Sequence, residues 1–205
     1  KERVHDTESV LRDIAAFYRA KGIRPTIYQS IREEGYFEEI GRELAACGFE
    51  YWTEPQRYMV LSGSSTIVPA PGIVVEKISE WKDEFRTGIF ERAGEPWETD
   101  VAKRALTNSN TLFFVARVQG QPVGMTHCHV TDGVCRVDYL LVSKVHRNMG
   151  VGRALIHSFV EYCRRNHIEN CYLWPDGETA EKIYSEAGFR YVETKYAGRA
   201  TYKEG

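Results

Sequence analysis

Long apolar runs are missing from this sequence of 205 residues. None approaches the roughly 20 residues of a membrane-spanning helix, and the opening stretch KERVHDTESV lacks the apolar core of a signal peptide. An excess of one charge is missing as well. The net charge is −2, which favours neither nucleic acid nor an anionic membrane as a partner. We therefore expect neither membrane nor nucleic-acid partners.

Paired cysteines are also missing. The five cysteines form no Cys-x-x-Cys pair and no metal-ligand spacing, and an odd number cannot all pair with one another. We expect reduced thiols in a cytoplasmic protein, several of them in the core, and no metal. The segment His127-Cys128-His129 does not change this expectation, because neighbouring residues of a strand point to opposite faces.

One clear linker divides the sequence. Residues 62–71 are rich in Ser, Gly and Pro, which predicts domains over 1–61 and 72–205. In the first domain, apolar spacing predicts helices over 4–21 and 36–47 with a short strand between them. Two further strands, joined by a turn at Pro55, are expected before the linker.

Residues 72–205 predict a mixed α/β fold. Strands 111–118, 122–130 and 134–142 are expected to be antiparallel neighbours, because glycine-containing turns join them. A helix ending near Asn166 then returns the chain to a strand over 170–174, parallel to 134–142 by a right-handed crossover. The other predicted elements are a strand over 73–78, helices over 81–92, 98–106 and 178–187, and strands over 189–196 and 199–202.

The stretch from Val134 to Leu155 combines a strand, a glycine-bearing turn and a helix. That order leaves free backbone N–H groups at a helix start, where the helix dipole is positive. Arg147 and Arg153 add charge, and glycines at 150 and 152 let a ligand approach the backbone. The pattern favours a phosphate or diphosphate pocket, and a plain tight turn is the alternative reading. It is neither the dinucleotide fingerprint nor a P-loop, because the further glycine and the Gly-Lys-Ser/Thr are absent.

The spacing Arg147-x-x-Gly150-x-Gly152, after the strand end Leu140-x-Val142, resembles the Arg/Gln-x-x-Gly-x-Gly/Ala motif of the GNAT superfamily of N-acetyltransferases. The resemblance covers about residues 72–205. It implies the GNAT fold, a mostly antiparallel twisted sheet with one parallel strand pair flanked by helices. It also implies acetyl-CoA or another acyl-CoA as co-substrate, without metal. The acyl group would pass to a primary amine of a small molecule or peptide by direct attack in a ternary complex.

The same resemblance implies roles for individual residues. Ala180-x-x-x-Tyr184-x-x-x-Gly188-Phe189 is similar to the helix that carries the family's general acid, so Tyr184 would protonate the departing thiolate. A core tyrosine on a helical stripe is the alternative. Strand backbone would hold the pantetheine arm, and the turn would hold the diphosphate. The cofactor-binding residues implied in this way are Leu140, Leu141, Val142, Arg147, Asn148, Met149, Gly150, Val151, Gly152 and Arg153.

The base that removes the amine proton stays open between Asp138, His127, His129 and water. Asp138 stands on the strand where many relatives carry a carboxylate, and strand alternation places it on the face of Leu140 unless a bulge intervenes. A solvated strand residue or a partner of Arg136 is an equal alternative. His127 and His129 share one strand face, and histidine titrates in the useful range.

Two features of the chain depart from the family pattern. Gly177 stands where the family often has an asparagine that contacts the cofactor, which keeps open a catalytically inactive, CoA-binding sensor or interaction module. Residues 1–61 resemble a partial, degenerate copy of the second half of the domain, with Leu44 in the place of Tyr184. This block could pack on its own C-terminal domain or on a second subunit, so a homodimer stays open.

Overall fold

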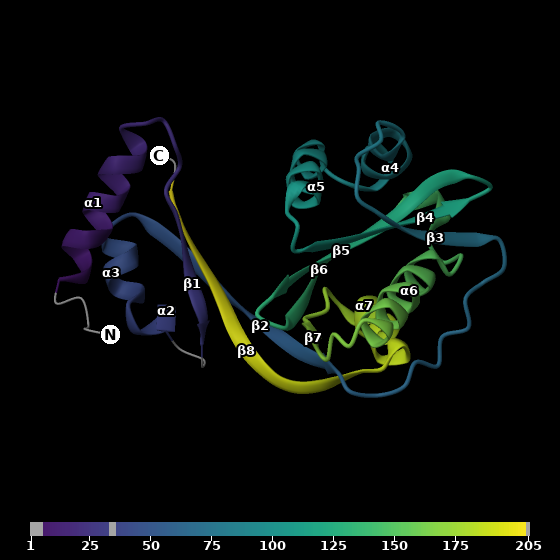
Figure 1. The fold of residues 1–205 in the computed structure, drawn as a ribbon. Coiled ribbons are helices and arrows are strands. Elements are labelled where there is room, and N and C mark those ends of the chain that lie inside the picture. The colour runs from purple at the N-terminus through teal and green to yellow at the C-terminus, as the bar shows by residue number, and fades with distance from the viewer. Residues whose placement is uncertain (1–5, 33–35, 204–205) are drawn as a thin grey trace. The chain divides into compact units, whose positions relative to one another are not determined.

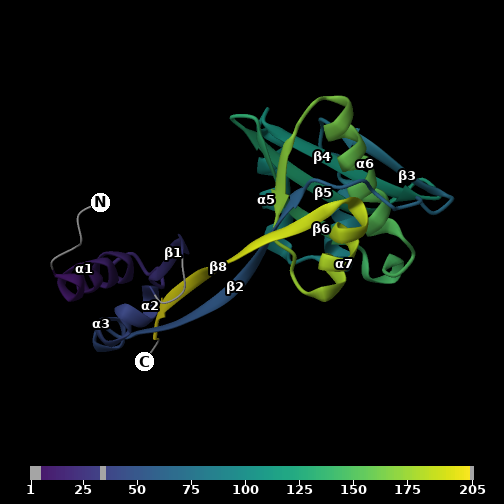
Figure 2. The same ribbon diagram turned by 90° about the horizontal axis from the view of Figure 1, so that it is seen from below.

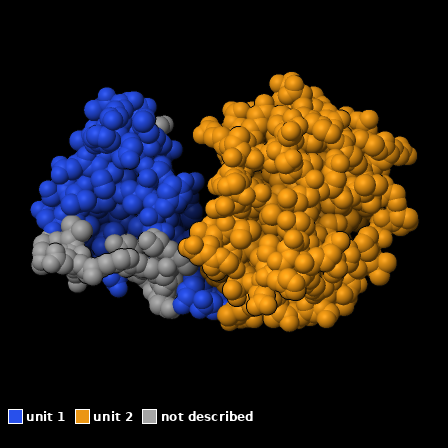
Figure 3. Space-filling view, in the orientation of Figure 1, with its two compact units in different colours: residues 1–57, 193–205 blue, residues 58–192 orange. Residues whose placement is uncertain are grey.

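The computed structural model of the chain describes residues 6–32 and 36–203. It falls into two compact units (Figure 3), one made of residues 1–57 and 193–205 and one made of residues 58–192. The sequence predicts the division at 62–71, with every later residue in the second domain. The units divide differently because two long strands, β2 (Phe49–Leu61) and β8 (Phe189–Tyr202), each contribute to both.

The first unit has the predicted order of helix, strand, helix and strand. Two differences from the prediction are local: the helix expected over 36–47 is broken at Ile40, and β2 runs through Pro55 without a turn. An exposed proline removes only one backbone donor, so a strand can accommodate it. Residues 4 and 5 of the first predicted helix lie outside the described residues. The elements before β2 are α1 (Thr7–Arg19), β1 (Thr26–Arg32), α2 (Tyr36–Glu39) and α3 (Gly41–Ala46).

The second unit follows the predicted alternation closely (Figure 1). The helix expected over 81–92 is shorter, and the two strands expected at the end of the chain form the single strand β8. The elements between β2 and β8 are β3 (Ile73–Ile78), the π-helical turn η1 (Arg86–Phe90), α4 (Glu91–Ala93), α5 (Pro96–Thr107), β4 (Thr111–Val118), β5 (Gln121–Thr131), β6 (Val134–Val142), the 3-10 turn η2 (Lys144–His146), α6 (Val151–Arg165), β7 (Asn170–Leu173) and α7 (Glu178–Ala187).

The strands are ordered β1-β8-β2-β7-β6-β5-β4-β3 in an eight-stranded sheet. The pair β6–β7 is parallel, and the pairs β4–β5 and β5–β6 are antiparallel, as predicted. Strands β3 and β4 are antiparallel as well. Helices α4 and α5 cover one face of strands β3 to β6, and α6 and α7 cover the other (Figure 1). Figure 2, viewed from below, brings α6 and α7 in front of the sheet. The mixed α/β class with one parallel pair is confirmed.

Helix α6 forms the centre of the larger core. Its apolar residues recur at helical spacing, so one face points into the sheet, and Leu155 and Phe159 are fully buried there. Burial of such a face, rather than intrinsic helix propensity, stabilises a helix of this length. Within residues 6–32 and 36–203, no helix combines the length and apolarity needed to cross a membrane.

We expect Leu155→Ala to lower the free energy of unfolding by about 3 kcal/mol, because it leaves a cavity in a closely packed core. The Leu155 side chain packs on Gly124, where an added Cβ would lie 3.2 Å from Leu155 Cδ1. Urea denaturation would measure the change. The exposed Val145→Ala should stay within about 0.5 kcal/mol of the parent, and an equal loss in both variants would contradict this packing.

The predicted linker is irregular, and backbone hydrogen bonds fasten it to the end of α7 within the second unit. Gly63 N–H donates to the Gly188 carbonyl at 2.9 Å, and Thr66 N–H donates to the Glu186 carbonyl at 2.8 Å. Gly188 ends α7 with φ +104°, and a Cβ there would lie 2.4 Å from the Gly63 oxygen. Glycine is therefore required at 188 both by its backbone conformation and by this close approach.

Candidate active site

The turn between β6 and α6 takes the conformation that the sequence suggests. Asn148 has φ 61° and Gly150 has φ 88°, and α6 begins immediately afterwards at Val151. A Cβ on Gly150 would lie 3.2 Å from the Cβ of Ala70, in addition to the strain of its left-handed backbone. The chain therefore turns sharply enough to aim the first amides of α6 out of the fold.

Those amides are available. In the part of the chain that the structure describes, no protein acceptor is recorded for the N–H groups of residues 148–153, and the first helical bond runs from Ala154 N–H to the Gly150 carbonyl at 2.9 Å. Arg147, Asn148 and Met149 are exposed. Free donors at the positive end of a helix of 15 residues form a site that favours an anion.

The two arginines of the turn are both engaged by protein groups. Arg153 forms a two-pronged ion pair with Glu186 of α7, with Nε–Oε2 at 2.6 Å and Nη2–Oε1 at 3.1 Å. Hydrogen bonding to Glu186 raises the pKa of Arg153, and the same contact lowers the pKa of Glu186. Arg147 Nε donates to the Val142 carbonyl at 3.3 Å. We therefore expect Arg153 to bind an anion through its backbone N–H and not through its guanidinium.

The edge of β6 that faces β7 is open beyond its first residues. The two strands pair from Val134 and Asn170 to Arg136 and Tyr172, and β7 then ends at Leu173. Residues 137–142 have no recorded strand partner on that edge in the described chain. A ligand that carries amide groups can therefore bind along this edge, next to the turn that holds the free N–H groups.

The side chains of β6 divide between the two faces. Leu140 and Val142 approach the start of α6, since a Cβ on Gly152 would lie 3.8 and 3.9 Å from their methyl groups. Leu141 points to the other face, into the core formed with η1 and α5. Of the predicted cofactor residues of β6, Leu140 and Val142 therefore place their side chains beside the start of α6, whereas Leu141 does not.

Tyr184 projects from α7 into the core under α6. Its side chain is 7% exposed, its ring packs against Phe189 with centroids 6.0 Å apart, and no hydrogen bond of its hydroxyl is recorded within the described residues. Burial raises the pKa of Tyr184 to about 12, and the charge of Asp176 acts in the same direction. The phenol therefore keeps its proton throughout the physiological range.

A β-bulge moves Asp138 away from the face of Leu140. Strands β5 and β6 pair His127 with Tyr139 and Cys128 with Val137, so Asp138 is the extra residue between them. Its carboxylate receives Arg136 Nε on Oδ1 and lies 3.2 Å from His129 Nε2 through Oδ2. Plain alternation along the strand is therefore wrong at this position. The bulge places Asp138 with the histidines instead.

The two histidines differ in environment. His127 is 5% exposed, and burial lowers its pKa to about 4 despite the nearby Asp138 charge. His129 has a side chain that is 31% exposed, and its Nδ1 lies 3.0 Å from the Thr111 hydroxyl. Of the two imidazoles, His129 is therefore the one that a molecule in solution can reach.

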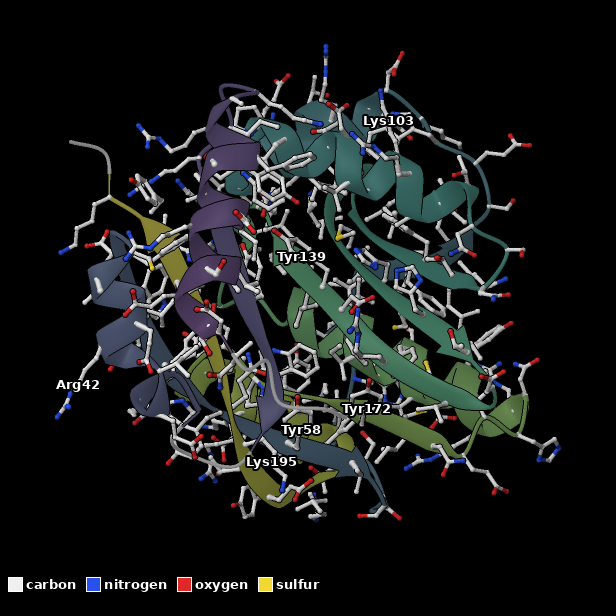
Figure 4. The ribbon with its side chains drawn as sticks, turned by 90° about the vertical axis from the view of Figure 1, so that its left-hand side faces the viewer. Arg42, Tyr58, Lys103, Tyr139, Tyr172 and Lys195 are labelled. Carbon is white, nitrogen blue, oxygen red and sulfur yellow. The ribbon has the colours of Figure 1, made fainter. Side chains whose placement is uncertain are left out.

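A cavity of about 460 Å³ opens beside His129 on this face of the sheet. Arg136 and Tyr172 border it, and Tyr58 stacks on Tyr172 with ring centroids 6.3 Å apart (Figure 4). The lining residues are Asn108, Asn110, His129, Thr131, Val134, Arg136 and Tyr172. The lining combines polar side chains with the ring of Tyr172, and the cavity is large enough for a small acceptor.

Comparison with known proteins decides the family. A sequence profile described as the acetyltransferase (GNAT) family matches residues 75–189, more than half of the chain. The chain belongs to the GNAT family of acetyltransferases. The resemblance seen in the sequence over residues 72–205 is therefore confirmed, and acetyl transfer is the general activity that membership implies.

The individual relatives share only limited sequence identity with this GNAT chain. An uncharacterized N-acetyltransferase of Methanocaldococcus jannaschii is 30% identical over 91 residues, which cover 40% of each protein. The match thus spans less than half of that relative. A GCN5-related N-acetyltransferase from Kribbella flavida has a TM-score of 0.68 at 17% identity, over 98% of this chain and 77% of that one. A tandem GNAT protein from the clavulanic acid biosynthesis pathway has a TM-score of 0.65 at 13% identity, over 96% and 70%. Both likenesses establish the fold.

The sequence predicts the glycine turn and a tyrosine on the helical stripe of α7 in this GNAT domain, but it does not show how the other side of the sheet is assembled. Gly177, at the position of the family asparagine, has φ 82° at the start of α7, and a Cβ there would meet nothing within 4 Å. The pairing of Asp138 with His129, and the stacking of Tyr58 on Tyr172, depend on strand register. The sequence alone indicates only that His127 and His129 lie on the same face of their strand.

Proposed function

We propose that this protein is an N-acetyltransferase that moves an acetyl group from acetyl-CoA to a primary amine of a small molecule or peptide, by direct attack within a ternary complex. The observation that carries the proposal is the set of free N–H groups over residues 148–153, next to the open edge of β6. The donors suit a diphosphate, and the edge suits the amides of a pantetheine arm. Bound acetyl-CoA would supply the activated thioester.

The residues of this chain would divide the work between the two faces of the sheet. The amides at the start of α6 bind the diphosphate, and the backbone of Leu140, Leu141 and Val142 holds and orients the arm. Tyr184 donates a hydrogen bond from its hydroxyl to the sulfur as negative charge develops there. Its high pKa supports this assignment, because the hydroxyl stays protonated at every working pH.

Asp138 and His129 would serve the acceptor. An amine must be deprotonated before or during attack, and His129, which contacts Asp138, lines a cavity that can hold a small molecule. His129 Nε2 lies 3.2 Å from Asp138 Oδ2, so the imidazole and the carboxylate would act together on the acceptor. His127 is 5% exposed and its ring lies between those of Phe113 and Tyr139, so it is less accessible to an acceptor than His129.

The test is a CoA-release assay with a panel of primary amines, run beside acetyl-CoA binding by calorimetry. We expect saturable acetyl-CoA binding and release of CoA that depends on an amine. Binding without any amine-dependent release would support the inactive CoA-binding module instead, an alternative that Gly177 keeps open. Failure of both acetyl-CoA binding and release would overturn the proposal.

We expect Asp138→Asn to lower kcat/KM for the amine by about 100-fold, because general base catalysis typically contributes this much. Asparagine keeps the size of the side chain, and KM for acetyl-CoA should change less than about threefold. The control is Asp132→Asn, an exposed turn residue whose φ of 51° asparagine tolerates. Equal rates in the Asp138 variant and the control would show that the Asp138 carboxylate takes no part in removing the amine proton.

A further inference from the structure

Three side chains, those of His127, His129 and Asp138, come together on the side of the sheet that holds the cavity beside His129. We call this side the acceptor face, and the sequence predicts no metal there. His127 and His129 reach from the same face of β5, and the bulge in β6 adds Asp138. Each residue brings one ligand atom, and these atoms all lie within 4.8 Å of one another. We propose that His127, His129 and Asp138 form a binding site for a divalent transition-metal ion of the Zn²⁺ type.

The donor set selects the class of ion. Two imidazoles and one carboxylate suit Zn²⁺, Co²⁺, Ni²⁺ and Fe²⁺, whereas Mg²⁺ and Ca²⁺ prefer oxygen ligands alone. Cys128 points to the opposite face and takes no part, which agrees with strand alternation. The three consecutive residues 127–129 offer only two ligands on one face of the strand. Asp138 supplies the third ligand from another strand.

His127 is held ready for such a role. Its ring lies between Phe113, with centroids 5.7 Å apart, and Tyr139, with centroids 5.8 Å apart and planes 7° from parallel. The side chain is 5% exposed, and its Nδ1 is buried with no hydrogen-bond partner in the described chain. A buried imidazole nitrogen without a partner is costly. A rigid ring that faces the other two ligands is therefore consistent with coordination.

The groups around the other two ligands also suit a metal. The Thr111 hydroxyl contacts Nδ1 of His129 at 3.0 Å, which fixes the ring so that Nε2 faces Asp138. Such an outer contact to the second imidazole nitrogen is typical of metal-ligating histidines. Arg136 engages Oδ1 of Asp138 and leaves Oδ2 on the side of the histidines.

The guanidinium of Arg136 opposes cation binding, and this gives the proposal a distinctive consequence. Its positive charge next to Asp138 weakens the attraction for a divalent ion. Removing that charge by Arg136→Gln should therefore tighten Zn²⁺ binding by about tenfold, whereas Asp138→Asn should weaken it by at least that factor. A purely structural ion pair predicts no such opposite effects.

Metal and acceptor would compete, a consequence that rests on the proposed function. Because the same His129 and Asp138 would receive the amine proton, a bound ion would block the acceptor side. Zn²⁺ would then inhibit acetyl transfer competitively with the amine and not with acetyl-CoA.

The experiment uses the full chain, freed of metal by chelator and without acetyl-CoA or amine. Zn²⁺ binding is measured by calorimetry and Co²⁺ binding by visible absorption. We expect one ion per chain, binding at least tenfold weaker in His129→Gln and Asp138→Asn, and unchanged binding in His167→Asn, an exposed histidine outside the site. His129 and Asp138 are partly exposed, so these variants should fold, and their melting temperatures check this.

Three results would overturn the site. The first is the absence of saturable binding up to millimolar ion. The second is binding that the two variants leave unchanged. The third is a thiolate-to-cobalt charge-transfer band, which would place the ion at the buried Cys135, Cys163 and Cys171, whose sulfur atoms also lie within 4.8 Å of one another. Since binding is measured without substrates, these results leave the test of acetyl transfer independent.

Discussion

Replacing Gly152 by aspartate is expected to raise KM for acetyl-CoA by at least about 30-fold, roughly 2 kcal/mol, while the protein stays folded. Gly152 is the second residue of α6, and a Cβ there would make only ordinary contact, 3.5 Å from Ile183 Cδ1. A carboxylate in the first turn is favourable for a helix. It would satisfy the free amides of residues 148–153 and repel a diphosphate. Steady-state kinetics with varied acetyl-CoA, and direct binding of CoA, would measure the effect.

The matched control is Gly152→Asn, which has the same size without the charge. It should raise KM by less than about fivefold, and both variants should melt within a few degrees of the parent. If the two variants impair binding equally, the effect is steric, and the repulsion between the aspartate and a diphosphate is not what weakens binding. If neither impairs binding, the cofactor lies elsewhere.

The turn could be predicted from the sequence because its determinants are local. Gly150 and Gly152 fix the backbone between a β-branched strand and an amphipathic helix, and no distant contact is needed to see this. The bounds of β6 and α7 were also correct, since each has a continuous pattern and a clear end. The sequence could not show that the charge of Arg153 is paired within the protein, because its partner Glu186 belongs to a different helix, α7.

The acceptor face could not be predicted because it depends on register. A single extra residue in β6 turns Asp138 toward His129, and nothing in the spacing of β6 alone announces a bulge. The same holds for the division into units. The end of β8 belongs to the first unit because Thr201 pairs with Thr26 of β1, and these two residues are far apart in the sequence. Long-range pairing decides such features, and composition does not reveal it.

Tyr184→Phe is expected to lower kcat by about 10²- to 10³-fold with little change in KM for acetyl-CoA, as for the loss of one donor to a developing charge. A thiol with a pKa near 8.5 is a stronger acid than this phenol, whose pKa is about 12. Full proton transfer to a finished thiolate would therefore be unfavourable. A hydrogen bond to the sulfur during bond breaking carries no such penalty.

The pH profile separates Tyr184 from other groups. Because the pKa of Tyr184 is raised, its hydroxyl stays protonated as pH rises and loses its proton only near pH 12. The parent enzyme should therefore show no basic limb from this residue below about pH 10, and Tyr184→Phe should lower kcat by the same factor from pH 6 to 9. A loss confined to one side of that range would contradict a donor role.

Tyr162→Phe is the matched control for the tyrosine variant. Tyr162 lies on α6 with its ring against Phe114, and the change removes one hydroxyl from the same core. Its kcat should stay within about twofold of the parent, whereas a loss equal to that of Tyr184→Phe would mean that packing limits the rate. Since the Tyr184 hydroxyl has no recorded hydrogen bond in the described chain, its removal should leave stability nearly unchanged. A kcat effect without a melting-temperature effect is therefore the result that would distinguish a hydrogen bond to substrate from support of the fold.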